Sequence, residues 1–295
     1  MMPGTGSPLP TSEHTGQPEF GDGIDPAALE AAIAGTRFAG KVRFFASIGS
    51  TNTHAMAEAD AGASEGMVYV ADEQTAGRGR GAHGWESPPG SGLYASVLLR
   101  PRMAPAEALW LSLAAGLAVQ DAVAQVTSIE AGLRGADLRW PNDLLLGRRK
   151  FCGILSEMNA EVTRIRHMVI GIGINVHQQR FPPELRDVAT SLFIETGRDW
   201  PRQELLAALL KSLEREVTAL ATPETRGAAT ASVLARLEQC SSWVRGKRVY
   251  VDELGGCAGV TEGLDARGFL QLRTPEGLRT VYSGGVREEK SSPNR

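Results

Sequence analysis

Glycine and basic residues alternate in the stretch from Gln74 to Trp85, which reads QTAGRGRGAHGW. Glycines let the backbone approach a ligand closely, and the planar cations Arg78 and Arg80 suit carboxylate and phosphate oxygens. Because the stretch has no apolar periodicity, it is not part of a packed core. Its composition predicts an anion-binding loop, although taken alone it fits a flexible surface loop with solvated arginines equally well.

A further candidate cation, Lys150, follows two arginines and opens the apolar segment from Phe151 to Met158. A run of positive charge at such a place is usually a solvated hairpin rim, which is the plainer interpretation. The alternative is a fixed ammonium group that stabilises negative charge during a reaction. Gly153 follows closely, and its lack of a side chain would let a ligand lie against bare backbone.

Three other segments carry polar groups next to predicted strands. In the segment Arg139 to Asp143, reading RWPND, Pro141 forces an extended turn that either projects polar groups or forms an Asx turn with a buried tryptophan. The Ser50-Thr51-Asn52 segment has side chains that either cap a helix or bind a ligand. The glycines of Gly171 to Asn175 admit a close ligand, but the third glycine and following helix of a dinucleotide fingerprint are missing.

In their order and spacing, these four segments and Lys150 to Leu155, reading KFCGIL, resemble biotin protein ligases. The resemblance runs from about Phe44 to Asn175 and continues more loosely to the C-terminus. It implies that biotin and ATP form biotinyl-5′-adenylate and pyrophosphate, after which the biotinyl group passes to a lysine of a carrier protein. The implied ligands are biotin, ATP and Mg²⁺, and the implied partner is the biotin carboxyl carrier domain of a carboxylase. The alternative is a lipoate-type ligase of the same structural family.

The resemblance also implies roles for individual side chains. Lys150 would bridge the biotin carboxylate and the α-phosphate, with Arg78 and Arg80 as further cations. Asp143 would either hold Mg²⁺ or orient the acceptor amine, and Trp85 would either pack on adenine or anchor the loop. The ligand-contacting residues that we expect are Ser50, Thr51, Asn52, Gln74, Gly77, Arg78, Gly79, Arg80, Trp85, Asn142, Lys150, Gly153, Gly171 and Asn175.

Three positions depart from the family or invite another reading. Where further basic residues commonly follow Arg80, this chain has Gly-Ala-His-Gly, which predicts a looser hold on the adenylate. Arg139 stands where the family often has lysine, which keeps the charge but changes its geometry. Cys152 lies near Lys150, but its apolar neighbours favour a buried strand cysteine over a nucleophile of the kind found in octanoyltransferases.

The histidines show no zinc-ligand spacing, so we expect no protein-held metal centre.

Period-two and period-3.6 patterns predict an α+β fold followed by a small β-barrel. The resemblance implies that the first part is a mixed β-sheet catalytic domain of the biotin/lipoate ligase type and that the barrel is SH3-like. We expect a disordered tail over 1–23, the catalytic domain over 24–240 and the barrel over 241–290. The expected helices are 24–34, 50–59, one that begins at 105, 202–220 and 229–240. The expected strands are 42–48, 67–72, 92–100, 137–140, 151–158 and 168–176, then 248–252, 258–264, 270–273 and 279–282.

Composition limits the partners and the compartment. The 295 residues carry a formal net charge of -3, so we expect no nucleic acid and no membrane surface as partner. No Lys or Arg precedes Arg37, which favours the short type of ligase without an N-terminal DNA-binding domain. The apolar run from Ala108 to Val119 is shorter than the ~20 residues of a membrane span. Three widely separated cysteines indicate a reducing compartment, the cytoplasm. Formation of a homodimer through a sheet edge is left open.

Overall fold

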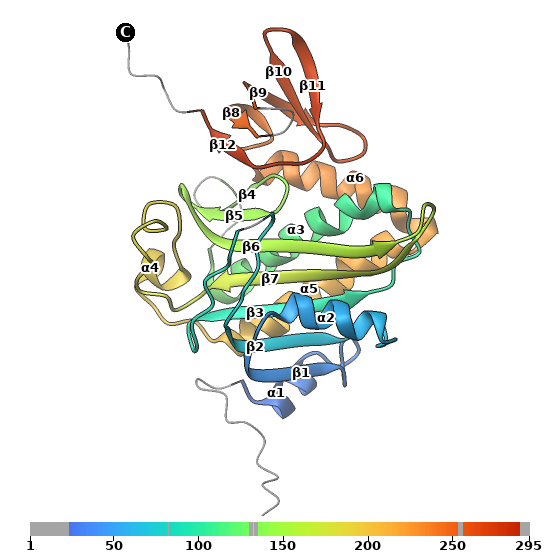
Figure 1. Ribbon diagram of the computed structural model, residues 1–295, viewed down its shortest axis with the longest axis vertical. Helices are drawn as coiled ribbons and strands as arrows, with labels where there is room; N and C mark the ends of the chain where they lie inside the picture. Colours follow the sequence, from blue (N-terminus) through green and yellow to red (C-terminus); the bar gives the residue numbers. More distant parts are fainter. Residues whose placement is uncertain (1–23, 82, 130–131, 133–134, 253–255, 290–295) are drawn as a thin grey trace, which may run out of the picture.

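The computed structural model describes residues 24–81, 83–129, 132, 135–252 and 256–289, and the tail predicted over 1–23 lies outside them. Helices and strands are mixed along the chain, and the last strands form a sheet of their own (Figure 1). The elements are α1 (Pro26–Ala32), β1 (Val42–Ile48), α2 (Thr51–Asp60), β2 (Val68–Gln74), β3 (Gly92–Leu99), a 3₁₀ turn (Pro105–Glu107), α3 (Ala108–Thr127), β4 (Ala136–Arg139), β5 (Asp143–Leu146), β6 (Arg149–Ala160), β7 (Ile165–Asn175), α4 (Leu192–Thr196), α5 (Arg202–Ala221), α6 (Pro223–Cys240), β8 (Arg245–Val251), β9 (Cys257–Leu264), β10 (Leu270–Thr274), β11 (Gly277–Val281) and β12 (Val286–Glu288).

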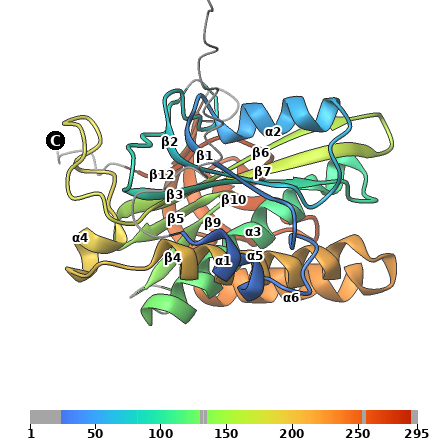
Figure 2. The ribbon, with the colours of Figure 1, turned by 90° about the horizontal axis from the view of Figure 1, so that it is seen from below.

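Seven strands form the main sheet in the order β1-β2-β3-β7-β6-β5-β4. The sheet is mixed because β1 and β2 are parallel while the other neighbours are antiparallel. Figure 2 shows α2 on one face of the sheet and α1, α3, α5 and α6 on the other. This arrangement buries β3 along its whole length, as its nearly continuous apolar sequence requires.

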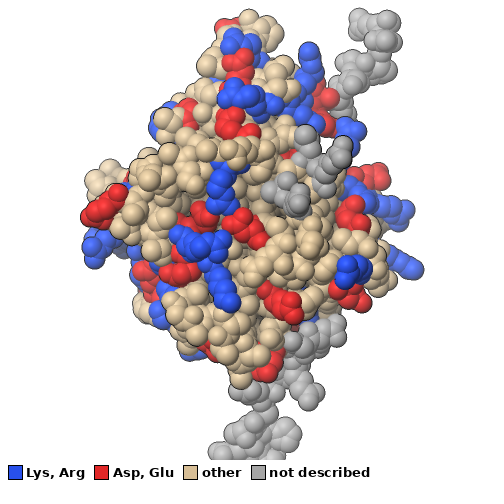
Figure 3. Space-filling view, turned by 180° about the vertical axis from the view of Figure 1, so that it is seen from behind, with Lys and Arg blue, Asp and Glu red and all other residues tan. Residues whose placement is uncertain are grey.

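Helix α3 is the apolar centre of the helical layer. Together with its preceding 3₁₀ turn, it is long and apolar enough to cross a membrane by length and composition, but it is mostly buried. It packs against the sheet and against α5, whose leucines 205, 206, 209 and 213 are buried. On the outer helical face, acidic and basic side chains are interspersed (Figure 3), and Arg236 pairs with Asp121 and Glu216 there.

The C-terminal strands form a five-stranded antiparallel sheet in the order β11-β10-β9-β8-β12. It lies at one end of the main sheet, above β4 and α6 (Figure 1). Its contacts with the main sheet include the Trp140 indole N–H, which donates to the Gly268 carbonyl at 3.0 Å, and just before β8 the Ser242 hydroxyl donates to the Asp137 carboxylate at 2.6 Å. These contacts bring segments about a hundred residues apart together beside the site described below.

The predicted α+β class is confirmed, and the local start signals correspond to helix starts. Asp25 caps α1 with Pro26 in its first turn, and the Ser50 side chain caps α2 by accepting from the Thr53 N–H. Sequence patterns missed β5, α4 and β12, which have only four, five and three residues. Elements this short show no period, and pairing with neighbours decides their conformation. The prediction also started α6 at 229, because its first turns lack apolar residues, whereas Pro223 begins it.

Candidate ligand-binding site

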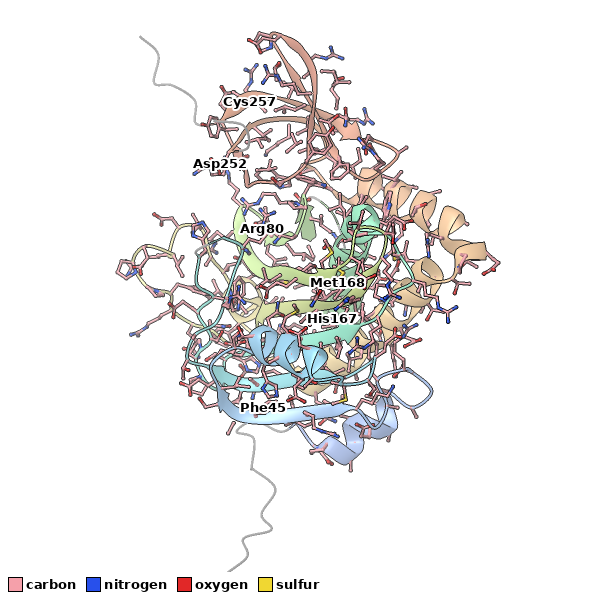
Figure 4. The ribbon with its side chains drawn as sticks, turned by 45° about the vertical axis from the view of Figure 1, so that its right-hand side comes forward. Phe45, Arg80, His167, Met168, Asp252 and Cys257 are labelled. Atoms are coloured by element: carbon pink, nitrogen blue, oxygen red, sulfur yellow. The ribbon has the colours of Figure 1, made fainter. Side chains whose placement is uncertain are left out.

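A cavity of about 800 Å³ lies where the main sheet meets the C-terminal sheet. Its wall combines the glycine-arginine loop (Gln74 to Trp85), the start of α2, the centres of β6 and β7, and the turn before β12. Arg80 of the loop and Asp252, which directly follows β8, both line it, and Figure 4 labels both. The cavity therefore joins segments from both parts of the chain.

Three glycines form the floor of the cavity. Gly153 and Gly173 are paired directly across β6 and β7, so their bare backbones lie side by side. A Cβ atom at Gly173 would lie 2.4 Å from the Trp85 indole nitrogen, and one at Gly171 would lie 2.2 Å from the Asn52 Oδ1. Trp85 thus rests on this floor, and its indole N–H is buried without a hydrogen-bond partner among the described residues. Only glycine permits this approach.

The charged end of the cavity is built around Asp143 on β5. Lys150 Nζ lies 2.6 Å from its Oδ1, and an Arg139 guanidinium nitrogen lies 2.6 Å from its Oδ2. Burial opposes ionisation, but the charges of Lys150 and Arg139 outweigh it and hold the pKa of Asp143 below its ordinary value. Lys150 Nζ also lies 5.1 Å from the centre of the Trp85 ring. The site therefore presents an ordered ammonium group next to an ionised carboxylate.

Another part of the cavity wall consists of hydroxyl and amide side chains. The backbone N–H and the hydroxyl of Thr51 donate to Gln74 Oε1 at 2.9 and 3.0 Å. The buried Ser96 hydroxyl lies 2.8 Å from both Thr51 Oγ1 and Asn52 Oδ1. Ser50 both caps α2 and lines the cavity. This network supplies fixed hydroxyl and amide groups that suit a neutral polar ring.

The glycine-arginine loop is folded back on itself. Gly79 N–H donates to the His83 carbonyl at 2.8 Å, and Trp85 N–H donates to the Gly77 carbonyl at 2.9 Å. Arg78 is paired with Glu157 at 2.9 Å, and Arg80 donates to the Gly284 carbonyl at 2.7 Å. Burial lowers the pKa of the Arg80 guanidinium, which the Asp143 charge partly opposes. Both guanidinium groups are thus oriented by protein partners at the cavity wall.

Comparison with known proteins fits this geometry. The model of the biotin/lipoate A/B protein ligase family matches residues 44–175, and that of the biotin protein ligase C-terminal domain matches 246–286. The biotin–[acetyl-CoA-carboxylase] ligase of Mycobacterium tuberculosis is 36% identical over 246 residues, which cover 82% of this chain and 86% of that protein. The chain belongs to the biotin protein ligase family.

Other members of the biotin protein ligase family match over similar lengths. The bifunctional ligase/repressor BirA of Bacillus spizizenii is 36% identical over 242 residues, 81% of this chain and 71% of that protein. The biotin protein ligase of Aquifex aeolicus, solved in complex with biotin and ATP, superposes with a TM-score of 0.71 at 30% identity. That match covers 85% of this chain and 100% of the Aquifex chain.

Most of the residues expected from the resemblance to biotin protein ligases line the one cavity, and two do not. A Cβ atom at Gly77 would lie 2.3 Å from the Trp85 carbonyl oxygen, outside the cavity lining. This glycine therefore allows the loop to pack against itself. Asn175 is buried, and its amide donates to the Thr190 carbonyl at 2.9 Å. The lining includes Ser50, Thr51, Asn52, Gln74, Arg78, Gly79, Arg80, Trp85, Asn142, Asp143, Lys150, Gly153 and Gly171.

Several residues that line the cavity of this biotin protein ligase were missed in the sequence. Ser96 had a usable signal, since it is a single small polar residue inside the otherwise apolar and aromatic strand β3. Asp252, Gly284 and Arg287 had none, because only tertiary packing brings the C-terminal sheet to the cavity. Cys152 is fully buried, and burial raises the pKa of its thiol, which confirms the prediction of a buried strand cysteine.

Proposed function

We propose that the protein is a biotin–[biotin carboxyl carrier protein] ligase that consumes ATP and releases AMP. The main observation in support is that Lys150, Arg139 and Arg80 line the same cavity as the glycine floor and the polar network around Thr51. Two mutually repelling substrates, a carboxylate and a triphosphate, need such fixed cations to approach each other. The names of the relatives, which include biotin ligases for acetyl-CoA carboxylase, support the same substrates.

In the first half-reaction, a biotin carboxylate oxygen bonds to the α-phosphorus of ATP while the bond from that phosphorus to the pyrophosphate oxygen breaks. Lys150 stabilises the negative charge that accumulates on the α-phosphate and the carboxylate. Arg78 and Arg80 contact the product adenylate and retain it. Asp143 keeps the Lys150 ammonium in place, since their charge-assisted contact is 2.6 Å long.

In the second half-reaction, the lysine amine of the carrier attacks the acyl carbon, and AMP leaves with the electrons of the broken C–O bond. The nitrogen loses one proton in this step, and water or the phosphate of the departing AMP takes it up. Asp143 holds the Lys150 ammonium in place during this step as well.

The residues around Asp143 suit Mg²⁺. Asn142 Oδ1 is buried next to Asp143 and has no hydrogen-bond partner among the described residues. Carboxylate and amide oxygens are ligands that Mg²⁺ accepts together with substrate phosphates. We assign Asn142 and Asp143 as the groups that would hold the ion, which when bound supplies further neutralisation of the triphosphate charge.

Two coarser assignments accompany this function. We propose that residues 24–240 form the catalytic domain and 241–290 the C-terminal domain, because separate family models match within these ranges. We also propose a cytoplasmic location, where the free cysteines 152, 240 and 257 stay reduced and a carboxylase carrier is available.

Incubation with biotin, ATP, Mg²⁺ and a biotin carboxyl carrier domain, followed by intact-mass measurement, tests the function. We expect the carrier to gain the mass of one biotinyl group, and to gain nothing when its acceptor lysine is replaced by arginine. Lipoate in place of biotin is the control for the related ligase class. Transfer of lipoate but not of biotin would overturn the proposal.

A further inference from the structure

The backbone of Lys150 is held by a segment that lies outside the regular ladder of the sheet. Its N–H donates to the Val188 carbonyl at 2.8 Å, and its carbonyl accepts from the Thr190 N–H at 2.9 Å. The pairing of β6 with β7 begins only at Cys152. Residues 188–190 therefore take the place of a neighbouring strand beside Lys150, with a parallel bridge from Lys150 to Ala189.

On its other side, Lys150 lies at an irregularity in the sheet. The register between β5 and β6 shifts by one residue, because Leu144 pairs with Cys152 whereas Leu145 pairs with Lys150. Such a bulge leaves one residue unpaired and re-aims the side chains next to it. The position of Lys150 thus depends on the 188–190 segment more than a residue within a regular ladder would.

Glu195 on α4 fastens that segment. Its Oε1 accepts from the Thr190 hydroxyl at 2.6 Å and from an Arg149 guanidinium nitrogen at 2.6 Å. Thr190 is fully buried, and its carbonyl accepts from Asn175 Nδ2 at 2.9 Å. One carboxylate therefore holds both the residue that precedes Lys150 in the chain and a residue that holds the Lys150 backbone.

We infer that Glu195, acting through Thr190, is a positioning residue for Lys150 in the reaction; this inference rests on the proposed function. Without the carboxylate, the buried Thr190 hydroxyl loses its acceptor and Arg149 loses its partner. The 188–190 segment then loosens, and the Lys150 ammonium with it. A displacement of about 1 Å at a reacting group can cost roughly 10²-fold in rate. Val188 also lines the cavity, so the same segment links the cavity wall to Lys150.

Glu195→Ala tests the inference through two measurements on the full chain. In biotin-dependent pyrophosphate exchange, we expect kcat to fall about 10- to 100-fold. The KM for biotin should change little, because the polar network that we assign to biotin is built from Thr51, Gln74 and Ser96, which lie on other elements than Glu195. In hydrogen exchange, the Lys150 amide should lose protection, since its acceptor at Val188 is no longer held. An unchanged kcat together with an unchanged Lys150 amide would overturn the inference.

Matched variants separate positioning from general stability. Glu161→Ala likewise removes a carboxylate that pairs with arginine, here Arg164 and Arg166 at the far end of the β6–β7 hairpin, and should leave kcat unchanged. Thr190→Val keeps the shape of the side chain and removes only the hydroxyl that donates to Glu195. If both act through this bond, the Thr190→Val/Glu195→Ala double variant should be no slower than the slower single variant. Additive losses would contradict the inference.

Hydrogen exchange keeps the two proposals distinguishable. If the unaltered protein shows no biotin-dependent exchange of pyrophosphate, the proposed function fails. The Lys150 amide still reports whether Glu195 fixes the backbone. If Glu195→Ala does not fold, Thr190→Val supplies both measurements, and normal kcat with normal protection in that variant would contradict the inference.

Discussion

The Lys150 ammonium and the Asp143 carboxylate lie 2.6 Å apart, in a cavity that the glycine-arginine loop also lines. They stand on neighbouring strands of a tight hairpin, where Asp143 pairs with Gly153. Because Arg139 binds the other carboxylate oxygen, the carboxylate is fixed from two sides. The ammonium group to which we assign the stabilisation of charge is therefore held in place by its protein partners.

Replacing Lys150 by alanine should reduce biotin-dependent pyrophosphate exchange by at least about 10²- to 10³-fold, the usual cost of losing one preorganised charge partner. Asp143 keeps Arg139, so the fold should persist, and circular dichroism checks this. Lys150→Arg is the matched control, because it keeps the charge but not the compact ammonium geometry. Normal exchange in the alanine variant would remove Lys150 from the mechanism.

Arg78→Ala should release the adenylate into solution faster. Arg78 contacts Glu157 and Thr53, so its loss both removes a cation and unfastens the loop from the sheet. The measurement is biotin incorporation into lysines of a bystander protein, with Arg164→Ala on the distant hairpin as control. Equal bystander labelling in the two variants would show that Arg78 does not retain the adenylate.

Replacing Asp143 by asparagine should make the free energy of unfolding depend less on pH in the acidic range. The pKa of Asp143 is lower in the folded protein than its ordinary value of 3.8, so its ionised form contributes stability above that value. This contribution is lost as the pH falls through the lower folded pKa. In urea, the free energy of unfolding of the variant should be lower by on the order of 2 kcal/mol at pH 7, and this difference should shrink below about pH 4. A constant difference would contradict the prediction.

Gly171→Ala should destabilise the protein by about 1–3 kcal/mol, because the added methyl would lie 2.2 Å from Asn52 Oδ1. Asn52 has little freedom to move, since Ser96 and Glu157 both bond to its side chain. Gly227→Ala on α6 is the matched control: no atom lies within 4 Å, and helix propensity should stabilise it by about 0.5–1 kcal/mol. Denaturant unfolding measures both, and a neutral Gly171→Ala would refute the tight approach.

Cys152 should resist alkylation in the folded protein. It is fully buried, and burial raises the pKa of its thiol, so little thiolate forms near neutral pH. Peptide mapping after iodoacetamide treatment should find Cys152 unmodified in buffer and modified in urea. Cys257, which is partly exposed, serves as the internal reference. Rapid labelling of native Cys152 would indicate that β6 opens readily.

The sequence alone determined the features that depend on near neighbours in the chain. The Ser50 cap, the amphipathic helix α5 and the apolar strand β3 follow from residue types at short spacing, and all three are found in the structure. The five matching segments likewise identified the family, because their order and spacing are properties of the chain itself. The charge pattern of the glycine-arginine loop indicated anion chemistry for the same reason.

The tertiary structure decided which of these groups meet. Strand order places Lys150 against Asp143, and the position of α4 brings Glu195 to the Arg149 guanidinium and the Thr190 hydroxyl. It also turned Asn175, expected at the ligand, toward Thr190, and brought Gly284 to Arg80 from two hundred residues away. Such contacts depend on how whole elements pack, and packing free energy is summed over many distant residues. The spacing of residues along the chain therefore does not predict these contacts.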